Sequence, residues 1–253
     1  MHRFFVDKNN VLEDEGMILI NNQDDVKHIT KVLRLTEKER VEVCDGDRYD
    51  YIGEIISATK TEVRVRIIEK YSSKTEANIC ITLYQGLPKS AKMDIIVQKC
   101  TELGVNQIVP LMTQRTVVQL KDKKSEEKKL ERWQKIADEA AKQCKRGILP
   151  NISAPITFQQ MLKHMSEYDL IVIPYEKEEA IGLKSIIRKN DAFKKVAIII
   201  GPEGGFEEDE VMAAKDAGAV PLTLGPRILR TETAGFVTLS ILMYELGDLG
   251  GTK

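Results

Sequence analysis

The sequence predicts an α/β domain preceded by a small β-domain, and two observations support this prediction. Residues 1–72 read as a series of short strands, and in the last of them Val63, Val65 and Ile67 alternate with charged neighbours, which is the period of a strand with one buried face. From about residue 77, apolar strands alternate with stretches of helical periodicity, the pattern of a parallel sheet with helical crossovers. We therefore expect two domains, at residues 1–72 and 73–253.

The first segment is expected to form a small β-barrel or sandwich. Short strands are predicted at residues 3–6, 17–20, 40–44, 49–56 and 62–68, with a more helical stretch at 26–35. Between the third and fourth strands, Asp45-Gly46-Asp47 supplies the chemistry of a hairpin turn, because glycine adopts the positive φ that such turns require. The polar run at residues 71–75 is the predicted linker.

The second segment is expected to form a parallel sheet covered by helices. Its strands are predicted at residues 79–85, 107–111, 170–174, 196–201 and 220–224. Apolar side chains three or four positions apart predict one helix before Gly104: Met93, Ile96, Val97, Cys100 and Leu103. A second helix is predicted to begin at a Ser125 cap, and further helices follow Glu207 and Thr231.

Composition limits the class of protein. The 253 residues include 38 Lys and Arg against 39 Asp and Glu, a formal net charge of −1, and 42% are hydrophobic. No apolar run approaches the roughly 20 residues that cross a bilayer, and the first residues lack the apolar core of a signal peptide, so a cytoplasmic protein is expected. The four cysteines and three histidines are scattered, so we expect neither a metal site nor a disulfide framework.

Two glycine-containing loops follow predicted strands and are candidates for a binding site. They read GPEGGF (residues 201–206) and GPRILRTETA (residues 225–234), and a third loop begins at residue 174. In an open α/β sheet, ligands bind beyond the carboxyl ends of strands, where glycine lets the backbone approach them closely. Neither loop has the spacing of the dinucleotide or Walker phosphate motifs. Four charged residues favour a shared site over plain turns: Glu203, Arg227, Arg230 and Glu232.

Several motifs together resemble a known family. The segments IIIGPEGGF (198–206) and LTLGPRILRTETA (222–234) resemble the signature loops of the SPOUT methyltransferases, in particular the RsmE family, which methylates N3 of a uridine in 16S (small-subunit) ribosomal RNA. Supporting segments are LPKSAKMDIIVQKCTELGV (87–105), IVPL (108–111), ERWQKIADEAAKQCKR (131–146), HRFFV (2–6) and HITKVLRL (28–35). The resemblance spans nearly the whole chain. It departs from the expected pattern at Lys145, where a smaller residue is expected before Arg146.

The resemblance implies a fold, a cofactor and an assembly. It implies an N-terminal PUA-like β-barrel that helps to hold RNA, a C-terminal SPOUT α/β domain tied in a deep trefoil knot, and a homodimer. It also implies S-adenosyl-L-methionine as the cofactor, gripped by the loops of the knot. The residues implied to bind it are Pro174, Gly201, Pro202, Glu203, Gly204, Gly205, Leu224, Gly225, Ile228, Leu229, Thr231, Thr233 and Ala234.

Methylation at uracil N3 would give roles to three charged residues. N3 carries a proton and is a weak nucleophile until that proton is lost, so the site needs a general base or a cation that stabilises the uridine anion. Arg230 is the expected cation, because a guanidinium presents several donors in one plane and stays charged. Glu232 or Glu203 is the expected base if partial burial raises its pKa. Alternatively, Glu203 caps the following helix or pairs with Arg230.

Basic residues outside these loops are candidates for contacts with RNA. They are Lys89, Lys92, Arg115 and Arg146, with Arg3 and Arg34 in the barrel. Residues 73–150 carry 15 basic and 9 acidic side chains, whereas both flanking segments are net acidic. The small total charge therefore conceals a local basic face, and a modest salt dependence of RNA binding is expected.

The sequence leaves several questions open. The strongly apolar helix predicted at residues 233–246 is buried either in the core or in a dimer interface. The chain is the methyltransferase described, a SPOUT methyltransferase for another RNA target, or a non-catalytic RNA-binding factor of ribosome assembly. The intact loops favour catalysis over a non-catalytic role. The assembled subunit is the expected substrate, in preference to naked RNA.

Overall fold

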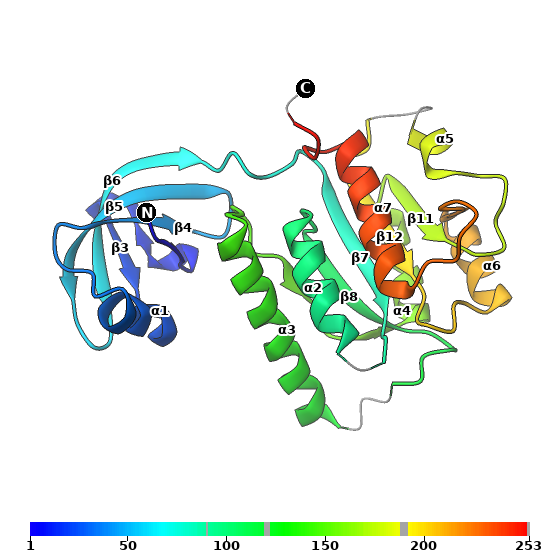
Figure 1. The fold of residues 1–253 in the computed structure, drawn as a ribbon, viewed down its shortest axis with the longest axis horizontal. Coiled ribbons are helices and arrows are strands. Elements are labelled where there is room, and N and C mark those ends of the chain that lie inside the picture. Colours follow the sequence, from blue (N-terminus) through cyan, green and yellow to red (C-terminus); the bar gives the residue numbers. More distant parts are fainter. Residues whose placement is uncertain (90, 119–121, 188–191, 252–253) are drawn as a thin grey trace. The chain divides into compact units, whose positions relative to one another are not determined.

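The computed structural model describes residues 1–89, 91–118, 122–187 and 192–251, and the chain divides into two compact units (Figure 1). The first unit comprises Met1–Glu76 together with Ala141–Leu149. The second comprises Ala77–Ala140 and Pro150–Lys253. The chain therefore returns to the first unit after the second has begun, which differs from a single division after residue 72.

The first unit contains a six-stranded sheet in the order β1-β4-β5-β6-β3-β2. Its strands are β1 (Arg3–Phe5), β2 (Val11–Leu12), β3 (Met17–Ile20), β4 (Arg40–Cys44), β5 (Tyr49–Ala58) and β6 (Val63–Ser72). Short helical turns connect them: η1 (Lys8–Asn10), η2 (Glu13–Glu15), α1 (Gln23–Lys27) and η3 (His28–Val32). β1 pairs with β4 in parallel, and the other described neighbours are antiparallel. In β6, Val63 and Val65 are buried and Arg64 is exposed, which confirms the predicted alternation.

The turn between β4 and β5 confirms the predicted hairpin. Gly46 has a φ of +70°, the left-handed conformation that glycine tolerates. The Asp45 carboxylate accepts hydrogen bonds from the backbone N–H groups of Asp47, at 2.8 Å, and Tyr49, at 3.0 Å. The side chain of Asp45 therefore holds the turn, as its position before the glycine predicts.

A buried ion pair attaches residues 141–149 to the first unit. Arg146 Nη2 lies 2.8 Å from Glu76 Oε2, and the two side chains are 4% and 7% exposed. Glu76 Oε1 also accepts hydrogen bonds from the backbone N–H groups of Gly147, at 2.7 Å, and Ile148, at 3.2 Å. One carboxylate therefore both neutralises the guanidinium and shapes the turn that follows it.

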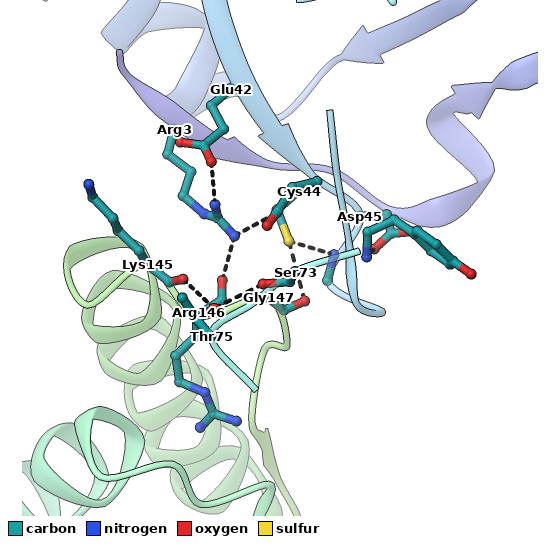
Figure 2. Close-up of polar contacts among 12 residues, drawn as sticks. Arg3, Glu42, Cys44, Asp45, Ser73, Thr75, Lys145, Arg146 and Gly147 are labelled. Carbon is teal, nitrogen blue, oxygen red and sulfur yellow. Dashed lines mark hydrogen bonds and ion pairs between the residues drawn. The ribbon is translucent and has the colours of Figure 1, made fainter. Parts of the chain in front are cut away.

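Residues 71–75, predicted as a linker, belong to this packed region instead (Figure 2). The Thr75 hydroxyl donates to the carbonyl oxygen of Lys145 at 2.8 Å, and Arg3 Nη2 donates to that of Arg146 at 2.8 Å. The linker prediction is wrong because this run is bonded within the first unit, with the partner of the Thr75 hydroxyl 70 positions away in sequence. Lys145 has a φ of +59°, a left-handed conformation that glycine adopts more easily than a residue with a long side chain.

The second unit contains a parallel sheet, as predicted, with seven described strands in the order β10-β8-β7-β12-β11-β13 and β9 beside β8. The short strands β9 and β10 add to the five that were predicted. Its strands are β7 (Cys80–Gly86), β8 (Gln107–Met112), β9 (Asn151–Ile152), β10 (Ile156–Thr157), β11 (Leu170–Pro174), β12 (Lys195–Ile200) and β13 (Val220–Leu222). Its helices are α2 (Lys92–Glu102), α3 (Lys123–Gln143), α4 (Phe158–Leu162), η4 (Met165–Glu167), α5 (Leu183–Ile187), α6 (Glu208–Asp216) and α7 (Thr231–Glu245).

Helices cover both faces of this sheet (Figure 1). Along β12, Ile198 and Ile200 face the core that includes α2, α3, α5 and α7, whereas Ala197 and Ile199 face the core that includes α4 and α6. Burial on both faces explains why β12 reads as a continuous apolar run and not as an alternating one. The described helices do not cover the carboxyl ends of the strands, where the connecting loops lie.

Two helices refine the sequence predictions. Helix α3 begins at Lys123, because Asp122 accepts a hydrogen bond from the backbone N–H of Ser125 at 2.7 Å, so Asp122 and not Ser125 acts as the cap. Helix α7 is the predicted apolar helix and buries Leu239 and Met243 against the sheet and α2, whereas Tyr244 is 63% exposed.

Among the residues that the structure describes, none of the helices combines the length and apolar character that a bilayer crossing needs. The same residues include no group of three or more His, Cys, Asp or Glu side chains arranged to hold a metal ion. The four cysteines, all in described positions, form no disulfide, and burial raises the pKa of Cys44 to about 12.

Replacing Glu76 by glutamine is expected to destabilise the first unit, because it removes the negative charge that faces the buried Arg146 guanidinium. Breaking one partner of a buried ion pair costs about 3–5 kcal/mol. Urea unfolding followed by circular dichroism measures the change. The matched control is Asp47→Asn, which breaks the exposed pair with Lys8 and should leave the free energy of unfolding nearly unchanged. Equally small effects of both substitutions would contradict a role for Glu76 in holding residues 141–149.

Candidate functional site

One pocket of about 1010 Å³ is formed at the carboxyl ends of the parallel strands in the second unit. Its walls come from the loops after β11, β12 and β13, together with Lys92 of α2 and Ala234 of α7. Since parallel strands end at the same edge of a sheet, the two glycine-containing loops were expected to share a pocket, and the structure confirms this.

Nearly all residues expected to bind the cofactor line this pocket. They are Pro174, Gly201, Pro202, Glu203, Gly204, Gly205, Leu224, Gly225, Ile228, Leu229, Thr231 and Ala234, whereas Thr233 is not among the lining residues. Lining residues that were not assigned to the cofactor are Lys92, Tyr175, Glu176, Glu178, Glu179, Ile200, Phe206, Thr223, Pro226, Arg227 and Arg230. Tyr175 and Glu176 belong to the third loop expected at the site, and Glu178 and Glu179 follow directly after it.

A buried hydrogen-bond chain joins the elements around the pocket. Gln85, near the end of β7, is fully buried, and its Nε2 donates to the hydroxyl of Thr231 at 2.8 Å. That hydroxyl donates to the carbonyl oxygen of Gly201 at 2.6 Å. Thr231 is the first residue of α7, and Gly201 directly follows β12. These two hydrogen bonds therefore connect three segments that are far apart in sequence.

The backbone of β7 passes directly beside the loop at residues 201–206. A Cβ atom on Gly86 would lie 2.4 Å from the backbone nitrogen of Pro202 and 2.7 Å from the carbonyl carbon of Gly201. Glycine is required at this position because no side chain fits such an approach. Within the loop, the N–H of Gly205 donates to the carbonyl oxygen of Pro202 at 3.0 Å, with a φ of +69° at Gly205.

Arg115, expected to contact RNA, braces the same loop. Its Nε and Nη2 donate to the two carboxylate oxygens of Glu207 at 2.7 and 2.9 Å, and Nη1 donates to the carbonyl oxygen of Gly204 at 2.8 Å. These hydrogen bonds raise the pKa of Arg115 and lower the pKa of Glu207. The planar guanidinium suits this forked pairing, so its donors are used within the chain.

Lys92 joins two of the predicted catalytic carboxylates. Its Nζ lies 3.2 Å from Glu203 Oε1 and 3.3 Å from Glu232 Oε2. The backbone N–H of Lys89 also donates to Glu203 Oε1 at 3.1 Å. The ion-pair partner of Glu203 is therefore Lys92 and not, as one alternative had it, Arg230.

The pKa of Glu203 is lowered and not raised. Partial burial acts to raise it, but hydrogen bonds from its own backbone N–H, from Lys92 and from the N–H of Lys89 outweigh that effect. The sequence-based condition for Glu203 as a base, a pKa raised by burial, is therefore not met.

Arg230 is exposed and lines the pocket at the start of α7. It occupies the N-cap position, and its carbonyl oxygen accepts from the N–H of Ala234 at 2.8 Å. The backbone of Arg230 is thus fixed by the helix, while its side chain extends from a pocket wall. This placement suits a cation that acts on a ligand in the pocket.

The remaining basic candidates divide into two groups. Lys89 and Arg34 are exposed, and Arg34 has a left-handed φ of +54°. Arg3 and Arg146 lie inside the first unit, with side chains 7% and 4% exposed. Their guanidinium groups pair with carboxylates of the same unit, Glu42 and Asp50 for Arg3 and Glu76 for Arg146, and their contact with RNA stays a prediction.

Family models match both units of the chain. A model described as RNA methyltransferase domain matches residues 75–243, and one described as RNA methyltransferase PUA domain matches residues 20–68. The chain therefore belongs to the RNA methyltransferases that carry a PUA domain, as its glycine-containing loops suggested.

Individual relatives define the family more closely. The chain is 35% identical over 257 residues to ribosomal RNA small subunit methyltransferase E of Bacillus subtilis, with 100% of both chains covered. It is 31% identical to that of Aquifex aeolicus, with 96% of this chain and 99% of the relative covered. The crystal structure of ribosomal RNA small subunit methyltransferase E from Neisseria gonorrhoeae, bound to S-adenosyl methionine, superposes with a TM-score of 0.85 at 29% identity, covering 98% of this chain and 99% of that one. The chain is a member of the ribosomal RNA small subunit methyltransferase E family.

Gly86→Ala is expected to displace the loop at residues 201–206, because the added methyl group would overlap backbone atoms that have no room to move. Overpacking of this kind typically costs about 1–3 kcal/mol. Chemical denaturation measures the loss. Gly182→Ala is the matched control, since a Cβ there meets nothing within 4 Å. A Gly86→Ala variant as stable as the control would contradict the tight backbone crossing.

Proposed function

We propose that this chain transfers a methyl group from S-adenosyl-L-methionine to N3 of one uridine in 16S (small-subunit) ribosomal RNA, acting on the assembled subunit. The observation that carries the proposal is the pocket in which the signature loops meet Arg230, Lys92 and Glu203. Glu232 is not among the lining residues but lies next to the pocket, where its carboxylate is 3.3 Å from Lys92 Nζ. Family membership supplies the reaction class, and the residues at the pocket supply the groups that N3 chemistry needs.

The pocket fits S-adenosyl-L-methionine in size and chemistry. Its volume of about 1010 Å³ lies at the upper end of the usual range for small-molecule sites, roughly 300–1,000 Å³, which leaves space for a nucleobase beside a cofactor. The close backbone of Gly201 and Gly205 and the apolar Leu224 and Leu229 suit an adenosine. Acidic side chains after β11, such as Glu176, suit a ligand that carries positive charges. These residues would hold the cofactor.

When bound, S-adenosyl-L-methionine supplies an electrophilic methyl group on a positively charged sulfur. The chain's own contribution is to orient the uracil ring, exclude water and stabilise the N3 anion. Arg230 would place guanidinium donors at a uracil carbonyl oxygen, where the negative charge of the anion is shared. Glu232, at the first turn of α7, would accept the N3 proton.

RNA recognition would use the exposed Lys89 near the pocket and the PUA domain, with Arg34 on its surface. Both residues carry charge that can meet phosphate, and the net charge near zero favours a few specific contacts over general binding to polyanions. A modest salt dependence of binding follows.

The proposal includes a deep trefoil knot in the SPOUT domain, a homodimer and a cytoplasmic location. The knot is supported by the resemblance of the loops at residues 201–206 and 225–234 to the knot loops of the family, and by the hydrogen bond from Thr231 to Gly201, which joins these two loops. The exposed Tyr244 on apolar helix α7 supports a dimer surface.

Mass spectrometry of ribosomal RNA from a strain that lacks the gene tests the proposed function. Loss of one N3-methyluridine from the small-subunit RNA, restored by the gene on a plasmid, is the expected result. Loss of a methyl group from another RNA would show that the chain methylates that RNA instead. An unchanged set of methylated nucleotides would overturn the proposal. Adding the purified chain to undermethylated subunits and to naked RNA distinguishes the two substrates.

Arg230→Ala is expected to lower kcat by about 100-fold while cofactor affinity changes by less than about threefold, because the guanidinium would act on the uridine anion. Single-turnover methylation and calorimetry measure the two quantities. Arg227→Ala, which removes a neighbouring exposed arginine of the same pocket, is the comparison. Near-normal turnover of Arg230→Ala, or an equal loss in both variants, would remove Arg230 from its specific role.

A further inference from the structure

Lys92 lies where three elements of the second unit meet. It is the first residue of α2, Glu203 belongs to the loop after β12, and Glu232 belongs to the first turn of α7. The ammonium group reaches both carboxylates, at 3.2 and 3.3 Å. The side chains of Lys92 and Glu203 are 30% exposed and that of Glu232 is 17% exposed, so all three are partly withdrawn from water. Lys92 and Glu203 line the pocket, and Glu232 lies behind them, in contact with Lys92.

We propose that Lys92 is a positioning residue for methyl transfer, which holds the carboxylate of Glu232 in place to accept the proton from N3. This inference rests on the proposed function and adds a role for a residue first considered as an RNA contact. A phosphate contact would require the ammonium to leave two carboxylates that it already joins.

The number of donors distinguishes the two carboxylates. Glu203 accepts from Lys92 and from the backbone N–H of Lys89, which reaches both of its oxygens, at 3.1 and 3.3 Å. Among the described residues, Lys92 is the ion-pair partner of Glu232. Because each donated hydrogen bond stabilises the ionised form, the additional donors make Glu203 a poor proton acceptor, in agreement with its lowered pKa. Glu232 is therefore the carboxylate proposed to take the proton.

The charges in the cluster also favour proton transfer. One ammonium faces two carboxylates, so the group carries one surplus negative charge when all three are ionised. Uptake of a proton by Glu232 makes the group neutral, which suits a partly buried site. Partial burial acts to lower the pKa of Lys92, but the contacts of its ammonium with the accepting carboxylates of Glu203 and Glu232 outweigh that effect and raise it, so Lys92 remains charged throughout.

The proposed step balances in atoms and electrons. The N3–H bond breaks and the proton moves to the Glu232 carboxylate, leaving its electron pair on N3. That pair forms the N3–CH3 bond, and the pair of the breaking C–S bond stays on sulfur, which leaves as a neutral thioether. No oxidant or reductant is needed, and the proton on Glu232 later passes to water.

Kinetics of methyl transfer to undermethylated small subunits test the role of Lys92. Lys92→Gln should lower kcat by about 100-fold, the size expected for a misplaced general base. The KM for subunits and the cofactor Kd should change by less than about threefold. Lys92→Arg, which keeps the charge, should recover at least about tenfold of the lost kcat. Lys99→Gln is the matched control on the same helix, where a half-buried lysine pairs with Glu102.

A double-mutant cycle distinguishes positioning through Glu232 from a general effect on folding. If Lys92 acts through Glu232, then Lys92→Gln should cost less than about threefold in kcat when Glu232 is already glutamine. Fully additive losses would overturn the proposal. So would an unchanged kcat, or a tenfold higher KM at normal kcat, which is the signature of a phosphate contact. Absence of methyl transfer by the wild-type chain would overturn the proposed function itself, an outcome distinct from these.

Discussion

The site depends on the buried hydrogen-bond chain from Gln85 through Thr231 to Gly201. Each of these residues belongs to a different segment, the end of β7, the start of α7 and the loop after β12. A buried polar group without a partner costs about 1–3 kcal/mol, so these hydrogen bonds favour one arrangement of the three segments over others. The close passage of Gly86 beside Gly201 adds a steric constraint at the same place.

This constraint positions the chemical groups. Because Thr231 is fixed at the first turn of α7, Arg230 is held one residue before it and Glu232 one residue after it. Lys92 then links Glu232 to the loop that carries Glu203, and Arg115 holds the far side of that loop through Glu207 and Gly204. The charged groups are thus carried by a rigid frame built from strand ends and a helix start, as preorganised catalysis requires.

Local patterns in the sequence predicted much of this arrangement. Alternation in β6, the apolar run of β12 and the glycine-containing loops were sufficient to place the strands and to gather most of the pocket. Contacts between distant polar residues were not predictable, because nothing near Arg146 indicates that Glu76 is its partner, and nothing near Lys92 indicates Glu203 and Glu232. Strand order was likewise unpredicted, since periodicity carries no information about neighbours in a sheet. The methyl-transfer reaction was predicted from the resemblance to a family and not from the pattern of residues.

Calorimetric titration of Thr231→Val with S-adenosyl-L-methionine tests the central claim most directly. The substitution keeps the shape of the side chain but removes the hydroxyl that links Gln85 to Gly201. If that link holds the pocket, cofactor affinity should fall about tenfold or more, equivalent to about 1.4 kcal/mol, in a protein that still unfolds cooperatively. Binding as tight as that of the wild-type chain would contradict the account.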